Sequence, residues 1–294
     1  MIGVQKARRR GFVAWRPHAV LTLLAVALVS SASCVGPVNH DSPKASADTE
    51  LSKSTIGVNA VTLRLGATRA ADIDAIKSRG FPIVRVSIEW PRVEPQPGQF
   101  DWRETDSIVR GLRAHGLRVL GNITYTPSWA AAPEGRLFVH PGPADPATFA
   151  AFARAAASRY RGEITMWELW NEPNIQASFA PAPDVAKFAA MLRATYPQLK
   201  AIDRRNVVIT GGTSPTSDTP LSISPQTFIE GLYSHGAGSS FDAVGMHPYA
   251  GKSYLSESTP DRWSSRRSIA DVSKIMSSHG QGNKQIWFTE FGAS

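Results

Sequence analysis

From residue 56 onward, short apolar segments alternate with longer amphipathic ones. The short segments are rich in Val, Ile and aromatic residues and show little polar alternation, as buried parallel strands do. They predict seven strands, at residues 56–60, 83–90, 118–125, 164–170, 207–211, 241–246 and 285–289.

The segments between these strands have apolar residues at helical spacing. In 185–202, for example, Val185, Phe188, Met191 and Leu192 recur every three to four residues and predict one buried helix face. The predicted helices are 70–78, 105–114, 147–160, 185–202, 226–234 and 266–278.

Most of the predicted helices end with a basic residue followed by glycine. The pairs are Arg79-Gly80, His115-Gly116, Arg161-Gly162, His235-Gly236 and His279-Gly280. Glycine can adopt the left-handed cap conformation, and the basic side chain meets the negative end of the helix dipole. We therefore interpret these three histidines as helix-end residues rather than metal ligands.

Seven strand–helix steps predict an α/β fold of the (β/α)8 TIM-barrel class. No glycine-rich phosphate loop opens a helix after the first strand, which argues against a doubly wound nucleotide-binding sheet. The sequence ends at Ser294, shortly after the seventh strand, so we expect the eighth βα unit to be lacking from a barrel domain at 56–294.

Composition favours a folded domain and limits its partners. The chain has 294 residues, is 42% hydrophobic and contains 8 Trp. The net charge is +8, but five positive charges come from Lys6, Arg8, Arg9, Arg10 and Arg16. The remainder is weakly basic, so we expect no nucleic-acid partner. The single cysteine, Cys34, excludes an intrachain disulfide and a cysteine-based metal site.

Residues 1–33 have the three parts of an export signal: a basic start, an apolar run and small residues before Cys34. The run is shorter than the roughly twenty residues of a membrane-spanning helix. Arg9-Arg10 resembles a twin-arginine export motif, and Ser31-Ala32-Ser33-Cys34 resembles a bacterial lipoprotein cleavage box, although Ser31 stands where leucine is usual.

We expect an exported bacterial protein, either a cell-surface lipoprotein lipidated at Cys34 or a secreted protein after ordinary signal cleavage. Any membrane contact would be through that lipid anchor. Residues 34–55 are rich in Ser, Pro, Asp and Lys and predict a flexible tether.

Two predicted strands end in a carboxyl group. Glu172 follows the strand that contains Trp167 and Trp170, and Glu290 lies 118 residues later, at the end of the seventh strand. The carboxyl ends of barrel strands meet at one mouth, and two carboxylates across a mouth are what glycoside hydrolysis requires.

These motifs resemble clan A of the glycoside hydrolases, nearest the xylosidase/iduronidase-like or cellulase-like families. The resemblance rests on Trp170-Asn171-Glu172-Pro173-Asn174, Thr289-Glu290-Phe291-Gly292, Val84-Arg85-Val86 and His247-Pro248-Tyr249. It implies a retaining glycosidase that cleaves the O-glycosidic bonds of an oligo- or polysaccharide and needs no cofactor or metal.

The resemblance also implies roles for the site residues. Glu172 would be the acid/base and Glu290 the nucleophile, roughly 5 to 5.5 Å apart. Arg85 would lie near Glu290, Asn171 would bind the sugar, and Tyr249 or His247 would hold the second oxygen of Glu290.

Several interpretations stay open. Arg85 could instead neutralise Glu168, and His247 could be a loop residue fixed by Pro248. Trp129 and Trp263, in loops, are candidate sugar platforms, whereas Trp167 and Trp287 are expected in the core. The alternative function is a catalytically impaired carbohydrate-binding surface lipoprotein.

Overall fold

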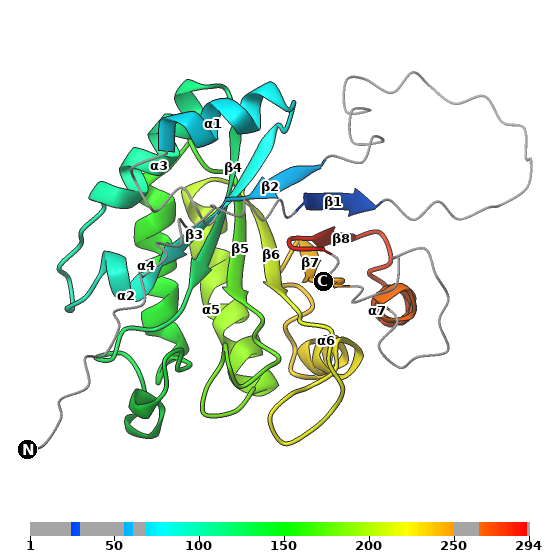
Figure 1. The fold of residues 1–294 in the computed structure, drawn as a ribbon. Coiled ribbons are helices and arrows are strands. Elements are labelled where there is room, and N and C mark those ends of the chain that lie inside the picture. The colour runs from blue at the N-terminus through cyan, green and yellow to red at the C-terminus, as the bar shows by residue number, and fades with distance from the viewer. Residues whose placement is uncertain (1–24, 30–55, 61–68, 250–264, 293–294) are drawn as a thin grey trace, which may run out of the picture.

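The seven predicted strands form a parallel, curled sheet (Figure 1). The computed structural model describes residues 56–60, 69–249 and 265–292, together with the backbone of 25–29. The parallel strands are β2 (Gly57–Asn59), β3 (Ile83–Glu89), β4 (Arg118–Thr124), β5 (Met166–Asn171), β6 (Val207–Gly212), β7 (Ala243–Met246) and β8 (Gln285–Phe288).

An additional strand closes the sheet into a barrel. The backbone of β1 (Ala25–Val29) pairs antiparallel with β2 on one side and with β8 on the other. An eighth βα unit is lacking from the described part of the chain, as predicted. The export role of residues 1–33 stays a prediction.

Helices flank the strands (Figure 1). The six predicted helices are present with ends shifted by at most two residues: α1 (Arg69–Ser78), α3 (Arg103–Ala114), α4 (Pro146–Arg159), α5 (Val185–Ile202), α6 (Pro225–Ser234) and α7 (Ser265–Ser278). Two short helical elements were not predicted, α2 (Trp90–Val93) and the 3-10 helix η3 (Pro133–Leu137). Each has proline in its first turn, and both are too short for an amphipathic pattern to be visible.

The predicted helix ends are confirmed by the backbone. Gly80, Gly116, Gly162, Gly236 and Gly280 all have positive φ, between 71 and 79°. Only glycine adopts this conformation without strain, so each glycine stops a helix and turns the chain toward the next strand.

The barrel interior changes from apolar to polar along the strands. One residue from each of β3 to β8 forms an apolar layer: Ile83, Leu120, Met166, Ile209, Ala243 and Trp287. Side chains two residues apart on a strand face the same side. Two residues beyond this layer, β3, β4 and β5 carry buried Arg85, Asn122 and Glu168, and buried Thr289 directly follows β8.

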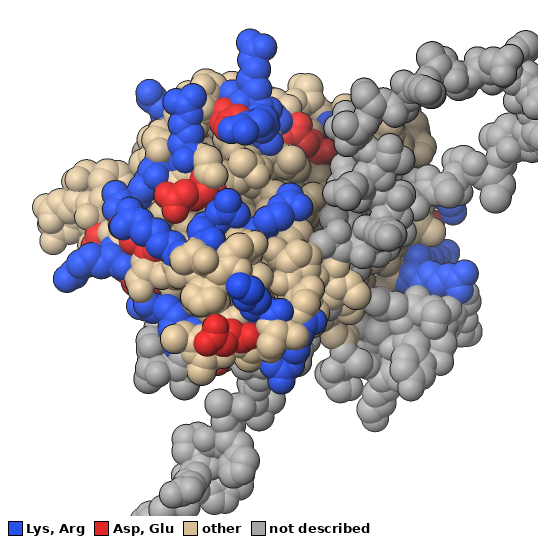
Figure 2. All heavy atoms as spheres, turned by 90° about the horizontal axis from the view of Figure 1, so that it is seen from above, with Lys and Arg blue, Asp and Glu red and all other residues tan. Residues whose placement is uncertain are grey.

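The tryptophans predicted as core are confirmed, because Trp167 is 0% and Trp287 is 5% exposed. Among the described helices, none combines the length and apolarity that crossing a bilayer demands. On the face seen from above, basic side chains are spaced apart and acidic ones lie among them (Figure 2).

Candidate active site

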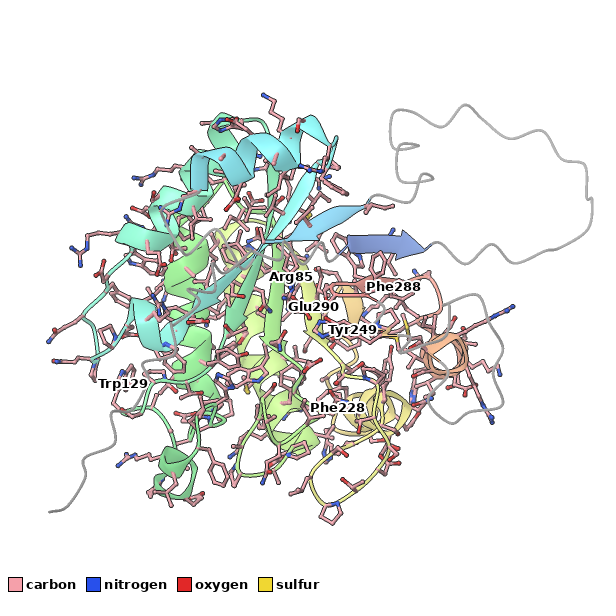
Figure 3. The ribbon with its side chains drawn as sticks, in the orientation of Figure 1. Arg85, Trp129, Phe228, Tyr249, Phe288 and Glu290 are labelled. Carbon is pink, nitrogen blue, oxygen red and sulfur yellow. The ribbon has the colours of Figure 1, made fainter. Side chains whose placement is uncertain are left out.

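Glu290, just after β8, lies among three hydrogen-bond donors, and Figure 3 shows two of them, Arg85 and Tyr249, beside it. Its Oε1 accepts from Asn59 Nδ2 at 3.0 Å and from Arg85 Nη1 at 2.6 Å, and its Oε2 accepts from the Tyr249 hydroxyl at 2.8 Å. Burial raises the pKa of Glu290. The neighbouring His247 ring, the Arg85 guanidinium and the Tyr249 hydroxyl outweigh burial, so this pKa lies below the ordinary 4.5. Glu290 is therefore held ionised.

Glu172, just after β5, has a different partner. Its Oε1 lies 3.2 Å from His247 Nδ1, and the same nitrogen lies 3.9 Å from Glu290 Oε2. These two carboxyl oxygens are therefore no more than about 7.1 Å apart. Retaining glycosidases have their two carboxyl groups roughly 5 to 5.5 Å apart, which this limit allows. The wider carboxyl separations of inverting glycosidases lie mostly beyond it.

Two non-glycine residues at the end of β5 have left-handed backbone. Trp170 has φ of 80° and Glu172 has φ of 46°. Side-chain residues rarely adopt such angles, and the cost is of order 1–3 kcal/mol each. The bend interrupts strand alternation on both sides of Asn171. It directs the side chains of this strand end differently from those of a regular strand.

Arg85 joins three strands through one guanidinium. Nε donates to Glu168 Oε2 at 2.6 Å, Nη1 to Glu290, and Nη2 to Asn171 Oδ1 at 2.9 Å. Both roles considered for Arg85 from the sequence are therefore present. It neutralises the buried Glu168 and also places a positive charge against Glu290. Because these are planar, directed contacts, they use the fork geometry that distinguishes arginine from lysine.

The structure separates the two candidates for the second oxygen of Glu290. Tyr249 makes that hydrogen bond, whereas His247, only 1% exposed, contacts Glu172 and Thr289. His247 directly follows β7, and its ring lies between Glu172, which follows β5, and Thr289, which follows β8. Its burial also leaves little surface for a direct sugar contact.

A polar cavity of about 190 Å³ lies beside Glu290. Its described lining includes Asn59, Arg85, Glu89, Asn122, Tyr125 and Asn171. The side-chain carbonyl oxygen of Asn171 accepts a hydrogen bond from Arg85. Its amide NH2 makes no hydrogen bond within the described chain. The carbonyl oxygen of Asn122 is buried and likewise has no partner among the described residues. The cavity therefore offers a free amide donor on Asn171.

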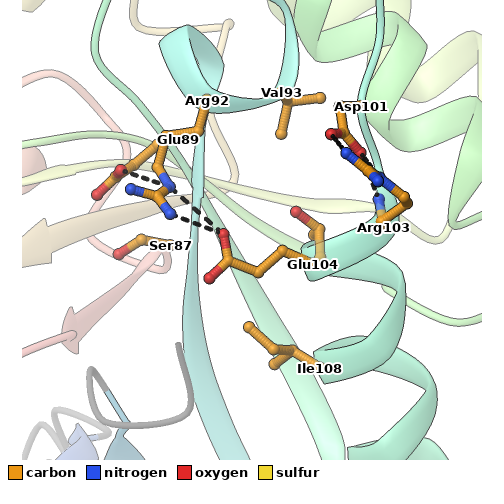
Figure 4. Close-up of a pocket in the computed structure, with 9 residues that line it drawn as sticks. Ser87, Glu89, Arg92, Val93, Asp101, Arg103, Glu104 and Ile108 are labelled. Carbon is orange, nitrogen blue, oxygen red and sulfur yellow. Dashed lines mark hydrogen bonds and ion pairs between the residues drawn. The ribbon is translucent and has the colours of Figure 1, made fainter. Parts of the chain in front are cut away.

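A second cavity, of about 480 Å³, shares Ser87, Glu89 and Ile108 with the first (Figure 4). Arg92 spans it, with Nη2 3.1 Å from Glu104 and Nε 3.7 Å from Glu89. The charged side chains that line this cavity form ion pairs with one another.

Trp129 is partly buried and packs against the hydrophobic core. Its Nε1 donates to the backbone oxygen of Glu94 at 3.0 Å, and its ring meets Trp90 edge-on at 5.5 Å. Figure 3 shows it well apart from Glu290, Arg85 and Tyr249. The expectation of a sugar platform at Trp129 therefore has no support in its position. Trp263 and Cys34 lie outside the described residues.

Four residues near the two glutamates were not predicted as site residues: Asn59, Tyr125, Glu168 and Thr289. Asn59 ends β2 and Tyr125 follows β4, so their position at strand ends is a signal that could have identified them. Glu168 and Thr289 lie deeper in the barrel. Each comes two residues after a member of the apolar layer, and this layer can be identified only once the register of the strands is known.

No group of three or more histidine, cysteine or acidic side chains in the described ranges has an arrangement that could hold a metal ion. Arg85 forms ion pairs with both Glu168 and Glu290.

Comparison with known proteins adds a family and a set of folds. The model of the cellulase family, glycosyl hydrolase family 5, matches residues 46–294. A 6-phospho-beta-glucosidase from Dickeya chrysanthemi is 30% identical over an alignment of 146 residues. The alignment covers 45% of this chain and 30% of that protein.

Solved structures share the fold. A family 39 glycoside hydrolase from Bacteroides cellulosilyticus WH2 matches with a TM-score of 0.60 and 23% identity, over 76% of this chain and 46% of that one. A family 39 beta-xylosidase from Caulobacter crescentus matches with a TM-score of 0.60 and 20% identity, over 79% and 52%. The chain thus spans about half the length of these structures.

Proposed function

The chain belongs to the cellulase family, glycosyl hydrolase family 5, and we propose that it is a retaining glycosidase with Glu290 as nucleophile and Glu172 as acid/base. The observation that carries this proposal is the unlike surroundings of two close carboxyl groups. Glu290 receives hydrogen bonds from three donors, whereas the hydrogen-bond partner of the Glu172 carboxyl in the described part of the chain is an imidazole nitrogen. Acid/base roles are assigned where environments drive two carboxyls toward different protonation states.

In the first step, a carboxylate oxygen of Glu290 attacks the anomeric carbon of the sugar. The bond from that carbon to the leaving-group oxygen breaks, and the proton of Glu172 passes to this oxygen. In the second step, the Glu172 carboxylate takes a proton from water. The water oxygen attacks the anomeric carbon, and the bond to Glu290 breaks. The sugar is released with its original anomeric configuration.

Arg85 and Tyr249 contribute to both steps. They stabilise the charge on Glu290 before attack and again when the carboxylate leaves. Asn171 is suited to a sugar hydroxyl through its amide NH2, because Arg85 holds its carbonyl oxygen.

We propose a substrate with an equatorial glycosidic bond. A 6-phospho-beta-glucosidase and a beta-xylosidase are among the similar proteins, so β-glucosides, their 6-phosphates and β-xylosides are the first sugars to test.

The test uses 2,4-dinitrophenyl glycosides of these sugars with the wild type, Glu290→Gln and Glu172→Gln. We expect release by the wild type and none above background by Glu290→Gln. Glu172→Gln should form the glycosyl-enzyme from this activated leaving group and then stall, and azide should restore turnover, because azide attacks without a general base. Equal loss in both variants without azide rescue would contradict the assignment. Sugar binding without release by the wild type would favour a carbohydrate-binding protein.

A further inference from the structure

Glu168 lies beneath the two glutamates, wholly buried on β5, and takes no direct part in the proposed reaction. Its Oε2 accepts from Arg85 Nε at 2.6 Å, and its Oε1 accepts from the backbone N–H of Gly212 at 3.0 Å. Both donors can only donate. Glu168 forms an ion pair with Arg85 as a carboxylate, and a carboxylate has no hydrogen of its own to give.

This fixes the direction of the next hydrogen bond. Thr289 Oγ1 lies 2.6 Å from Glu168 Oε1 and must donate to it. A hydroxyl carries one hydrogen, so toward any other partner Thr289 can only accept. That partner is His247 Nε2, at 3.1 Å. Nε2 must therefore carry the hydrogen in this contact.

A neutral imidazole with hydrogen on Nε2 has none on Nδ1. Nδ1 faces Glu172 Oε1 at 3.2 Å, and this contact is a hydrogen bond only if Glu172 supplies the hydrogen. The other groups that face the ring are Glu168 Oε1 and Glu290 Oε2, each at 3.9 Å, too far for a hydrogen bond. Glu290 takes its donors from Asn59, Arg85 and Tyr249 instead.

We propose that Glu168 and Thr289 are positioning residues that set the Nε2–H tautomer of His247 and thereby reserve a proton for Glu172. The proposal rests on the proposed function, in which Glu172 must begin each cycle protonated. It extends that function by naming what makes Glu172, rather than Glu290, the protonated carboxyl group. The buried hydrogen-bond chain begins at the ion pair of Arg85 with Glu168 and ends at Glu172.

Thr289→Val removes the hydroxyl with little change in shape, and Thr289→Ser keeps it. In Thr289→Val, His247 Nε2 loses its acceptor, so hydrogen can move to Nδ1 and point toward Glu172. A carboxyl that faces a donor is favoured in its ionised form. Glu172 would then be a poorer acid while Glu290 keeps all three donors.

The test has two readouts. The first is the ¹⁵N spectrum of the imidazole nitrogens in histidine-labelled protein near neutral pH, with His247 assigned by its loss in His247→Gln. We expect hydrogen on Nε2 alone in the wild type and Thr289→Ser, and a shift toward Nδ1 in Thr289→Val. Hydrogen on Nδ1 alone, or on both nitrogens, in the wild type would overturn the proposal.

The second readout compares glycosides with poor and activated leaving groups. Thr289→Val should lose roughly 100-fold in kcat/KM with an alkyl leaving group, within the usual contribution of a general acid. It should lose less than about 10-fold with 2,4-dinitrophenyl, which needs no proton, and Thr289→Ser should restore the wild-type ratio. Equal losses on both substrates would overturn the proposal, since misfolding acts on both alike. If the wild type cleaves neither substrate but shows the Nε2–H tautomer, the proposed function fails and the hydrogen-bond chain stands.

Discussion

Arg85 Nη1 lies 2.6 Å from Oε1 of Glu290, although 205 residues separate them in the sequence. The same guanidinium donates to Glu168 and Asn171, so a single charge links β3 to β5 and to the end of β8. Arg85 is 2% exposed and Glu168 is 0% exposed. The positive group that favours an ionised Glu290 is thus also part of the barrel's buried framework.

Removal of this charge should destabilise the fold. In Arg85→Met, Glu168 would be left buried without its partner, and breaking a buried pair in this way costs about 3–5 kcal/mol. Urea denaturation followed by tryptophan fluorescence measures this loss. Arg103→Ala, which removes an exposed partner of Asp101, is the control and should leave the midpoint nearly unchanged. An Arg85→Met midpoint equal to the wild type would contradict the role of the buried pair.

The acid limb of the pH–activity profile should depend on Glu290. Its pKa lies below 4.5, and attack requires the ionised form, so kcat/KM should fall only as the pH drops through that lowered pKa. The same group adds stability that is present above its unfolded-state pKa and is lost as pH falls through the folded one.

Tyr249→Phe removes one donor from Glu290. The pKa of Glu290 should rise, and the acid limb should move to higher pH, because the hydrogen bond from Tyr249 favours the ionised carboxylate. Tyr196→Phe removes a hydroxyl that donates to the distant Asp242 and should leave the limb in place. An unshifted limb in Tyr249→Phe would show that this hydrogen bond does not hold the charge of Glu290.

Gly212 permits the close packing of His247. A Cβ at this position would clash with His247 Nε2 and would lie 2.6 Å from Thr289 Oγ1. Gly212→Ala should therefore displace the imidazole, lower kcat/KM and cost about 1–3 kcal/mol of stability. Gly111→Ala, in helix α3, is the control, because its Cβ would meet only the end of the Ile73 side chain. Thermal unfolding and kcat/KM are measured for both variants. A Gly212→Ala variant with wild-type stability and kcat/KM would contradict the close packing of Gly212 against His247.

Trp129→Phe distinguishes packing from sugar binding. The change removes the hydrogen bond to the Glu94 backbone oxygen, so we expect a loss of about 1 kcal/mol in unfolding free energy and an unchanged KM. A KM that rises while stability is retained would return Trp129 to the role of a sugar platform.

The architecture could be predicted from local signals. Apolar strands, amphipathic helices and the glycines that end five helices are encoded in neighbouring residues. The seven parallel strands and the six longer helices were found, whereas β1 was not predicted as a strand. The short helix at Trp90–Val93 was not, because the predicted strand 83–90 runs into it and Pro91 is the only visible signal.

The candidate site could be predicted only in part. Glu172, Glu290, Arg85 and Tyr249 lie in motifs with recognisable neighbours, and the barrel brings them together. Asn59 is one residue at the end of a short strand, and its contact with Glu290 spans 231 positions. Glu168 and Thr289 gain their importance from the tertiary register, which also decides that His247 faces Glu172 rather than Glu290.

Capture of the glycosyl-enzyme tests the central claim most directly. The protein is incubated with activated 2-fluoro-β-glycosides of the sugars that it cleaves, and the labelled peptide is mapped by mass spectrometry. The fluorine slows release of the covalent sugar, so the label accumulates on the nucleophile. We predict a label on Glu290 that is absent in Glu290→Gln. A label on Glu172 or elsewhere, with Glu290 unmodified, would contradict the assignment.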